Sequence, residues 1–432
     1  MSESLLNWED YLQVASLSDV GMRRMTNQDN FSISLANSME QYQRKGHLFI
    51  VADGMGAHNA GELASKLAID HIPHLYSKYN HSSAPEELKK AVLDANGEIH
   101  RRGQANEEFH QMGTTCSVLM LLPQGAVAAH VGDSRVYRLT QNRLEQLTFD
   151  HSLVWEMKAA GHLTAEEEKA GKIPKNVITR SLGPYAECKV DLEGPFPVQV
   201  GDTFLLCSDG LTGVISDAEL GAILANMSPH ESARVLVDLA NLRGGPDNIT
   251  VVIVKATHPQ MATHGSVSML RVNARPMRGV ISPFWYVMFG AGLVLTLLFW
   301  LSSGWASAWL PAVVAVISGI YLGYKLLSTN RHGQSVTPDK RFGKGPYSRV
   351  GCAVGATFSK QLADTISKLK QGALDEGWKV DWDHWNSLIS EAETAVKGKD
   401  FSRSIRAYGR AISFLMDQLR NQNDASTSSI DL

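Results

Sequence analysis

The sequence of 432 residues contains only four cysteines, Cys116, Cys188, Cys207 and Cys352, which are widely scattered and form no CxxC pair. This spacing argues against a disulfide framework and against a zinc site. Cys116 and Cys207 fall in apolar, strand-like runs, so we expect buried thiols in a reducing compartment.

The chain also lacks a strong excess of charge and an apolar export signal. Its formal net charge is −3 and no domain is strongly basic, so a nucleic-acid partner has little electrostatic support. Acidic residues (Glu3, Glu9 and Asp10) stand where an apolar signal core would begin, and we expect no cleaved export signal. The length allows two or three compact units.

Four aspartates lie beside short apolar runs in the first 250 residues. Asp53, Asp133 and Asp209 each follow such a run, and Asp247 precedes one. Runs of this length, rich in β-branched residues, predict buried strands whose ends lie at a rim of the core. If these rims converge, each like-charged pair at about 4 Å costs roughly 4 kcal/mol at an effective dielectric of about 20. The cluster then needs protons or cations, and an all-oxygen donor set favours Mg²⁺ or Mn²⁺ over Zn²⁺.

Strand-like and helix-like segments alternate through residues 12–256 and predict one compact catalytic domain. A polar excursion at Asp150–Leu182 is expected to hold two short helices, the second capped by Thr164 and Glu167. The clearest strands and helices are expected at Met112–Leu122 and Gly125–Val131, and at Ala60–Tyr76 and Pro85–Arg102, respectively.

Six regions are expected along the chain. They are a catalytic domain at 1–256, a linker at 257–280, two membrane-spanning helices in a hairpin at 281–327, a basic juxtamembrane linker at 328–349, a helical, tetratricopeptide-like region at 350–424, and a disordered tail at 425–432.

The hairpin is predicted from two apolar stretches, at about 282–301 and 309–327, with no charged residue before Lys325. About 20 helical residues cover the roughly 30 Å hydrocarbon core. Tryptophan and tyrosine lie towards the ends of both stretches, and both outer flanks are basic. The positive-inside rule then predicts a two-pass protein of the inner (cell) membrane, with the catalytic domain and the C-terminal region in the cytoplasm. A buried helical hairpin in a soluble domain is the alternative.

The C-terminal region shows two helical faces, at Trp382–Ala395 and Ile405–Leu419, separated by a break at 398–400. The pair resembles one tetratricopeptide-like hairpin. Because a single repeat buries little surface, a helical hairpin that packs on another part of the protein is the favoured interpretation. The tail is also a candidate for binding a protein partner.

A family resemblance is carried by several motifs in one order. They are SDVGMRRMTNQDN (18–30), VADGMGAHNAGELAS (51–65), MGTTCSV (112–118), VGDSRVYRL (131–139), CSDGL (207–211) and GGPDNITVV (244–252). Over about residues 12–256 the chain resembles the metal-dependent serine/threonine protein phosphatases of type 2C, bacterial branch. The resemblance implies an α+β fold, an αββα sandwich of two antiparallel sheets flanked by helices. The residues alone do not distinguish this fold from a parallel α/β sheet.

The resemblance also implies roles for individual residues. Two core ions of Mn²⁺ or Mg²⁺ are expected, with a third, weaker one as an option. The implied metal ligands are Asp53, the Gly54 carbonyl, Asp133, Asp209 and Asp247. Asp29 is implied to hold a metal-bound water, and Arg24 to bind the phosphate, so that Arg24, Asp29 and Asp53 form the catalytic group. Singly, an aspartate before glycine is more often a turn residue.

Several positions depart from the family pattern or leave alternatives open. Arg23 is the neighbouring alternative to Arg24, although the spacing from Gly21 selects Arg24. Met55 stands where animal-type members place a histidine, so the general acid is unassigned. His58 is expected to be a surface residue, and His151 structural.

Gln28 replaces a glutamate of some relatives, which suggests that waters hold more of the second metal's shell. The function implied is hydrolysis of phosphomonoesters by a metal-activated water without a covalent intermediate. Expected partners are phosphoserine and phosphothreonine proteins, a cognate membrane-associated kinase and the lipid bilayer. The rival is a catalytically weak or inactive phosphoprotein-binding scaffold or sensor.

Overall fold

The computed structural model describes residues 8–57, 59–80, 82–164, 167, 173–174, 177–263, 283–303, 309, 311–316, 318–319, 341–352 and 355–428. The chain divides into two compact units. Met1–Tyr79, Ala84–Val267 and Arg341–Leu432 form the first unit, and Asn80–Ser83 with Ser268–Lys340 form the second.

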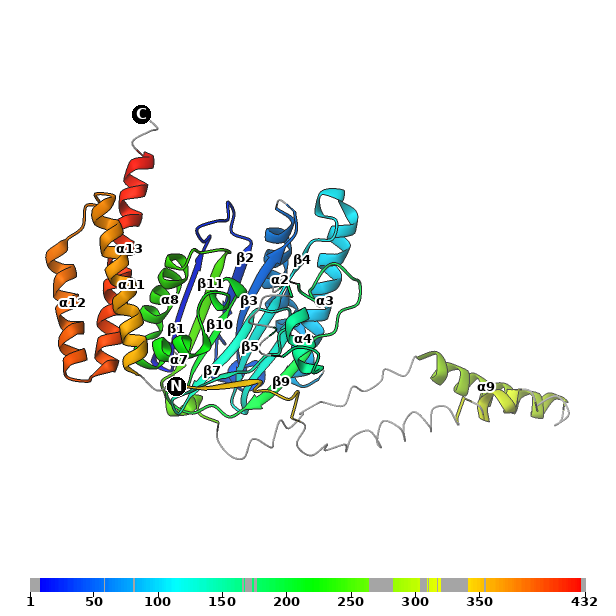
Figure 1. Cartoon of the computed structure of the whole chain (residues 1–432). Helices are drawn as coiled ribbons and strands as arrows, with labels where there is room; N and C mark the ends of the chain where they lie inside the picture. The colour runs from blue at the N-terminus through cyan, green and yellow to red at the C-terminus, as the bar shows by residue number, and fades with distance from the viewer. Residues whose placement is uncertain are drawn as a thin grey trace. The chain divides into compact units, whose positions relative to one another are not determined.

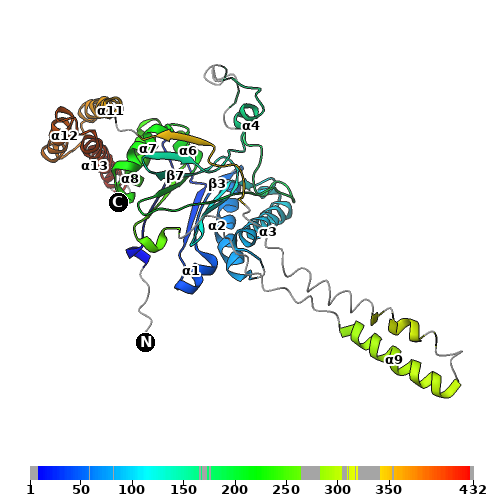
Figure 2. The same cartoon turned by 90° about the horizontal axis from the view of Figure 1, so that it is seen from below.

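Two sheets form the centre of the first unit, and all their strand pairs are antiparallel (Figures 1 and 2). In the first sheet the strand order is β1 (Leu12–Asp19), β11 (Ile249–Ala256), β10 (Thr203–Cys207), β7 (Arg135–Thr140), β8 (Arg143–Gln146) and β12 (Ser348–Gly351). In the second it is β2 (Asp29–Ser34), β3 (His47–Met55), β5 (Cys116–Leu122), β6 (Gly125–Val131) and β9 (Asp191–Phe196), with β4 (Gly113–Thr114) paired to β3.

The sheets pack face to face, and helices cover their outer faces. Side chains of both sheets, including Phe49, Leu119 and Val252, share one buried cluster. Helices α2 (Ala60–Lys78) and α3 (Ala84–Ala105) lie on the second sheet, while α7 (Asp217–Asn226) and α8 (Pro229–Leu242) lie on the first (Figure 1). Strands β5 and β6 are buried at every position, because one face meets the other sheet and the other meets helices. The expected αββα sandwich is confirmed.

The shorter helices lie in the connections. They are η1 (Trp8–Asp10), α1 (Met39–Lys45), η2 (Glu107–Phe109), α4 (Leu153–Ala159), α6 (Asp209–Thr212) and η3 (Pro259–Met261). The expected capping box is present, because the Thr164 N–H donates to Glu167 Oε2 at 3.0 Å and the Glu167 N–H to Thr164 Oγ1 at 3.3 Å.

Three helices follow the last strand: α11 (Ala356–Asp375), α12 (Trp382–Lys397) and α13 (Phe401–Ser428). The predicted break at 398–400 is confirmed, and the favoured interpretation holds, since α13 packs against α7 and α8 (Figure 1). Buried side chains of α8, α11 and α13 belong to one cluster. The tail expected at 425–432 is wrong in part, because α13 continues to Ser428.

The linkers predicted at 257–280 and 328–349 both include residues that belong to the folded first unit. The start of the first, at 257–263, packs on the catalytic domain: the Thr257 N–H donates to the Tyr11 carbonyl, and Met261 is buried. The end of the second forms β12, because residues 348–351 pair with the edge strand β8. Residues 264–280 and 328–340 lie outside the described part of the chain.

The second unit contains helix α9 (Pro283–Ser303). Among the residues that the structure describes, no helix is both long and apolar enough to span a membrane. This finding does not support the two membrane-spanning helices expected at 281–327, a stretch that lies partly outside the described residues.

Candidate active site

The predicted aspartates lie at strand ends on one rim of the sandwich. Asp29 and Asp53 stand directly opposite each other in β2 and β3. Asp133 follows β6 and Asp209 follows β10, at the first position of α6, whereas Asp247 precedes β11. Because β10 and β11 are neighbours, the loops that carry Asp209 and Asp247 emerge at the same edge.

The pKa values of the aspartates indicate that the carboxylates lie close enough to repel one another. Burial raises the pKa of Asp53 well above its usual range, and the charges of Asp29, Asp209, Asp133 and Asp247 raise it further. The pKa of Asp209 is also raised, first by burial and then by Asp247, against a hydrogen bond with Asp53. Burial is likewise the main cause of the raised pKa values of Asp29 and Asp133.

The donor set fits a divalent cation. One oxygen each of Asp29, Asp133 and Asp209 (Oδ1) is buried and accepts no hydrogen bond within the described structure. Buried carboxylate oxygens without donors are costly unless a proton or a cation compensates them. In the same described residues, no three His, Cys, Asp or Glu side chains already stand in a metal-binding arrangement. The fit instead rests on chemistry, because buried carboxylate oxygens without donors suit Mn²⁺ or Mg²⁺.

Gly54 follows Asp53 at a point where the chain packs against its neighbours with no room for a side chain. Its N–H donates to the Gln28 carbonyl at 3.2 Å, and a Cβ added there would lie 2.1 Å from the Gly61 carbonyl oxygen. Any larger residue would push the segment that carries Asp53 out of place, so the glycine is required at this position.

Arg24, rather than Arg23, contacts the acidic cluster. Its Nη2 lies 2.8 Å from Asp247 Oδ2, and 53% of its side chain is exposed. Asp247 is the main cause of the raised pKa of Arg24, with Asp53 and Asp209 adding to it. A guanidinium that is held beside the cluster yet open to solvent can bind the oxygens of an incoming phosphate.

The loop that carries Arg24 is held by Asn248, whose part the sequence did not reveal. Asn248 Nδ2 donates to the Val20 carbonyl at 2.9 Å and to the Thr26 carbonyl at 3.0 Å. Asn248 Oδ1 accepts the Gln28 N–H at 2.9 Å. Only 5% of Asn248 is exposed, so these bonds are shielded from water.

Two hydroxyls hold the aspartates themselves. Ser208 Oγ donates to Asp29 Oδ2 at 2.7 Å and accepts the Thr250 N–H at 2.9 Å. Thr115 Oγ1 accepts the Asp53 N–H at 2.9 Å. Ser208, Thr115 and Asn248 all stand inside the family motifs, and that was the only signal available; their partners are distant in sequence.

The histidines weighed from the sequence have different outcomes. His151 is structural, as predicted. The Gly132 N–H donates to the ring Nδ1 of His151 at 3.0 Å, and the backbone N–H of His151 donates to the Gly132 carbonyl at 2.7 Å. It thus supports the turn that carries Asp133. His58 lies outside the described residues.

Comparisons with known proteins agree with this geometry. A family model described as protein phosphatase 2C matches residues 23–241. The protein phosphatase PhpP of Streptococcus pneumoniae is 38% identical over 248 residues, which cover 56% of this chain and 97% of that protein. Two crystal structures of bacterial serine/threonine phosphatases match 57% of this chain and 100% of their own. PstP/Ppp of Mycobacterium tuberculosis is 33% identical with a TM-score of 0.50, and the enzyme of S. agalactiae is 34% identical with a TM-score of 0.51.

Proposed function

Because the chain belongs to the protein phosphatase 2C family, we propose that it hydrolyses phosphoserine and phosphothreonine monoesters of proteins without a covalent intermediate. It is a metal-dependent serine/threonine protein phosphatase of the bacterial type, and its cofactor is Mn²⁺ or Mg²⁺. The observation that carries the proposal is the gathering of carboxylates from five distant segments at one rim, with Arg24 beside them.

Each site residue has a role in this proposal. Asp53, with the Gly54 carbonyl, Asp209 and Asp247, would hold the two core ions, and Asp133 would join Asp209 at a third. When bound, the ions lower the pKa of a water molecule and neutralise charge on the phosphoryl oxygens.

The remaining groups orient the reactants. Asp29, whose Oδ2 accepts a hydrogen bond from Ser208, would hold a metal-bound water. Arg24 would leave Asp247 and bind two phosphoryl oxygens in a fork, an arrangement that lysine cannot make. Substrate binding and metal binding are then coupled, because both compete with the Arg24–Asp247 ion pair.

The test is turnover by the full chain with Mn²⁺, measured on a phosphothreonine peptide and on a small aryl phosphate. We expect activity that is lost with chelator, is restored by Mn²⁺ and is nearly abolished by Asp53→Asn. A matched control is Asp70→Asn, a change of the same kind on the surface of α2. Bound metal without turnover would instead favour the inactive scaffold.

We also propose that the chain acts at the cell membrane, attached through 281–327, with a membrane-associated kinase acting on the same substrates. The support is the sequence: its apolar stretches, the aromatic residues near their ends and the basic flanks. Fractionation tests this location. Extraction of the full chain into alkaline carbonate without detergent would contradict it.

A further inference from the structure

Strand β12 closes the edge of the first sheet, although it lies outside the family match at 23–241. It pairs with β8 over four residues, from Ser348 opposite Gln146 to Gly351 opposite Arg143. On its other side β8 pairs with β7, the strand that follows Asp133. A segment beyond the family domain therefore becomes part of the sheet that leads to the active site.

The segment around β12 is bonded to both sheets. The Tyr347 N–H donates to the Gln146 carbonyl at 2.8 Å. The Tyr347 hydroxyl donates to Glu193 Oε1 at 2.6 Å, and the Gly345 N–H to Glu193 Oε2 at 2.9 Å. Glu193 is a buried residue of β9 in the second sheet. The segment thus spans the side of the sandwich.

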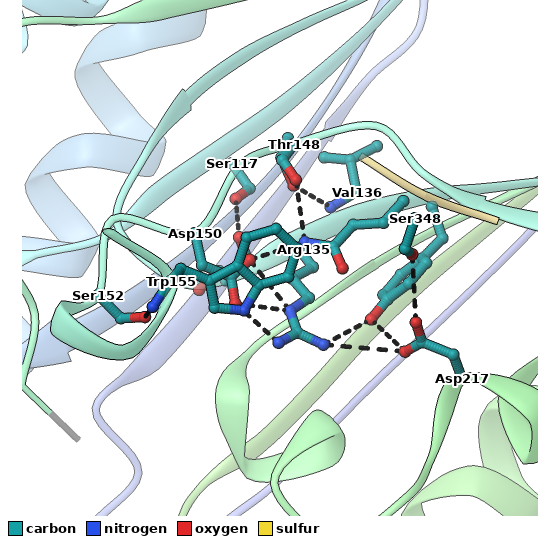
Figure 3. A network of polar contacts seen from close by, with 12 residues as sticks. Ser117, Arg135, Val136, Thr148, Asp150, Ser152, Trp155, Asp217 and Ser348 are labelled. Atoms are coloured by element: carbon teal, nitrogen blue, oxygen red, sulfur yellow. Dashed lines mark hydrogen bonds and ion pairs between the residues drawn. The ribbon is translucent and has the colours of Figure 1, made fainter. Parts of the chain in front are cut away.

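A chain of polar contacts runs from β12 into the core (Figure 3). Ser348 Oγ donates to Asp217 Oδ2 at 3.3 Å, and the Tyr137 hydroxyl donates to Asp217 Oδ1 at 2.9 Å. Arg135 Nη1 donates to that hydroxyl at 2.8 Å, and Arg135 Nε donates to Asp150 Oδ2 at 2.8 Å. Figure 3 shows Arg135 at the centre of this network, between Asp150 and Asp217.

The network ends on the turn that carries Asp133. Arg135 is two residues beyond Asp133, and His151, next to Asp150, makes the two bonds to Gly132 described above. The Ser134 and Thr115 hydroxyls lie 2.7 Å apart, and Thr115 also accepts the Asp53 N–H. A displacement of Arg135 would therefore shift the positions of both Asp133 and Asp53.

Helices α7 and α8 of the catalytic domain make specific contacts with this C-terminal region. A Cβ on Gly221, inside α7, would lie 2.3 Å from Cys352 Sγ, one residue beyond β12. On α8, Asp238 has a fully buried side chain and pairs with Arg420 of α13. Glu231 pairs with Arg410 at 2.6 Å. A glycine inside a helix is unfavourable by itself, and here it leaves room for the Cys352 side chain. Asp238 has a second partner on α8 itself, Arg234 at 3.6 Å, and Arg420 adds a contact from α13.

We propose that residues 341–428 are a built-in positioning element of the phosphatase: docked β12 holds Asp217, which through Tyr137 and Arg135 fixes the Asp133 turn for metal binding. Ser348 and Asp217 are positioning residues that act through Arg135. The expected effect on metal-dependent turnover rests on the proposed function. The ordering of the Asp133 turn by β12 does not.

Three full-length single variants and one double variant, Ser348→Ala with Asp217→Asn, test it. Ser348→Ala and Asp217→Asn weaken the network at successive contacts, whereas Arg349→Ala removes only the neighbouring β12 ion pair with Glu145. We measure hydrogen exchange of the amides at 131–136 without metal, Mn²⁺ binding by calorimetry, and turnover against Mn²⁺ concentration. Asp217→Asn should speed the exchange and raise the Mn²⁺ concentration at half-maximal activity by about threefold or more. Ser348→Ala should act in the same direction and add little in the Asp217→Asn background.

Arg349→Ala should leave all three measurements unchanged. The proposal is overturned if Ser348→Ala and Asp217→Asn exchange and bind Mn²⁺ as the wild type does, or if Arg349→Ala acts as strongly. Absence of turnover in every protein would refute the proposed function, while hydrogen exchange would still decide the positioning role. If Asp217→Asn fails to fold, Ser348→Ala alone decides.

Discussion

Replacing Asn248 with alanine should release the loop that carries Arg24. The change removes two donated bonds, to Val20 and Thr26, and one accepted bond, from Gln28. At about 1 kcal/mol for each buried bond, the loss of unfolding free energy is about 3 kcal/mol. For a domain of this size that corresponds to a melting temperature lower by about 6–12 °C.

The effect on catalysis follows from Arg24. A charge-assisted bond between Arg24 and phosphate contributes about 1.5–3 kcal/mol, so its complete loss raises KM by about 10- to 100-fold. Asn248→Ala loosens the loop without removing the guanidinium. We therefore expect a rise in KM that is smaller than that of Arg24→Ala, with kcat less affected.

Asn96 offers a matched control. It is also buried, donates to the carbonyls of Tyr185 and Ala186, and accepts the Gly183 N–H. Asn96→Ala should lose similar stability, because it removes the same number and kind of bonds, but it leaves the Arg24 loop anchored. Thermal melts and steady-state kinetics on a phosphothreonine peptide compare the two. Equal KM values in both variants would refute the role given to Asn248.

Three other predictions follow from the site and the core. Arg24→Ala should raise KM by about 10- to 100-fold with a smaller fall in kcat, and an unchanged KM in steady-state kinetics would remove Arg24 from the site. Asp209→Asn should nearly abolish turnover yet raise the melting temperature of the metal-free protein at pH 8, because the raised pKa of Asp209 shows that its charge opposes folding; a lower melting temperature would contradict this. Burial lowers the pKa of His47 to about 3, so the unfolded state binds its proton first as pH falls below about 6.5, and stability should fall by about 1 kcal/mol between pH 7 and 5.5. In urea unfolding, the free energy of unfolding of His47→Asn should lack that fall between pH 7 and 5.5. The same fall in the variant as in the wild type would contradict the assignment to His47.

The catalytic core was predictable because its signals are local. The apolar runs before Asp53 and Asp209 form buried strands, and the helices at 60–76 and 85–102 lie close to their expected bounds. Periodicity alone could not decide between a parallel and an antiparallel sheet, because strands buried on both faces lose their polar alternation. The motif order, not the pattern, selected the sandwich.

The contribution of the C-terminal region could not be predicted in the same way. Residues 348–351 form a strand only because β8 offers an unpaired edge to them, and a short basic segment with glycine and proline nearby carries no strand signal of its own. The bonds of Asn248, the residue before β11, join it to a loop more than 200 residues away. Such pairings are set by tertiary structure.

The central claim is that the carboxylates around Asp53 form a divalent metal site. Calorimetric titration of the full-length wild type and Asp53→Asn with Mn²⁺ tests it most directly. The account predicts at least two ions bound by the wild type and loss of the tight binding in the variant. Identical stoichiometry and affinity in the two proteins would contradict it.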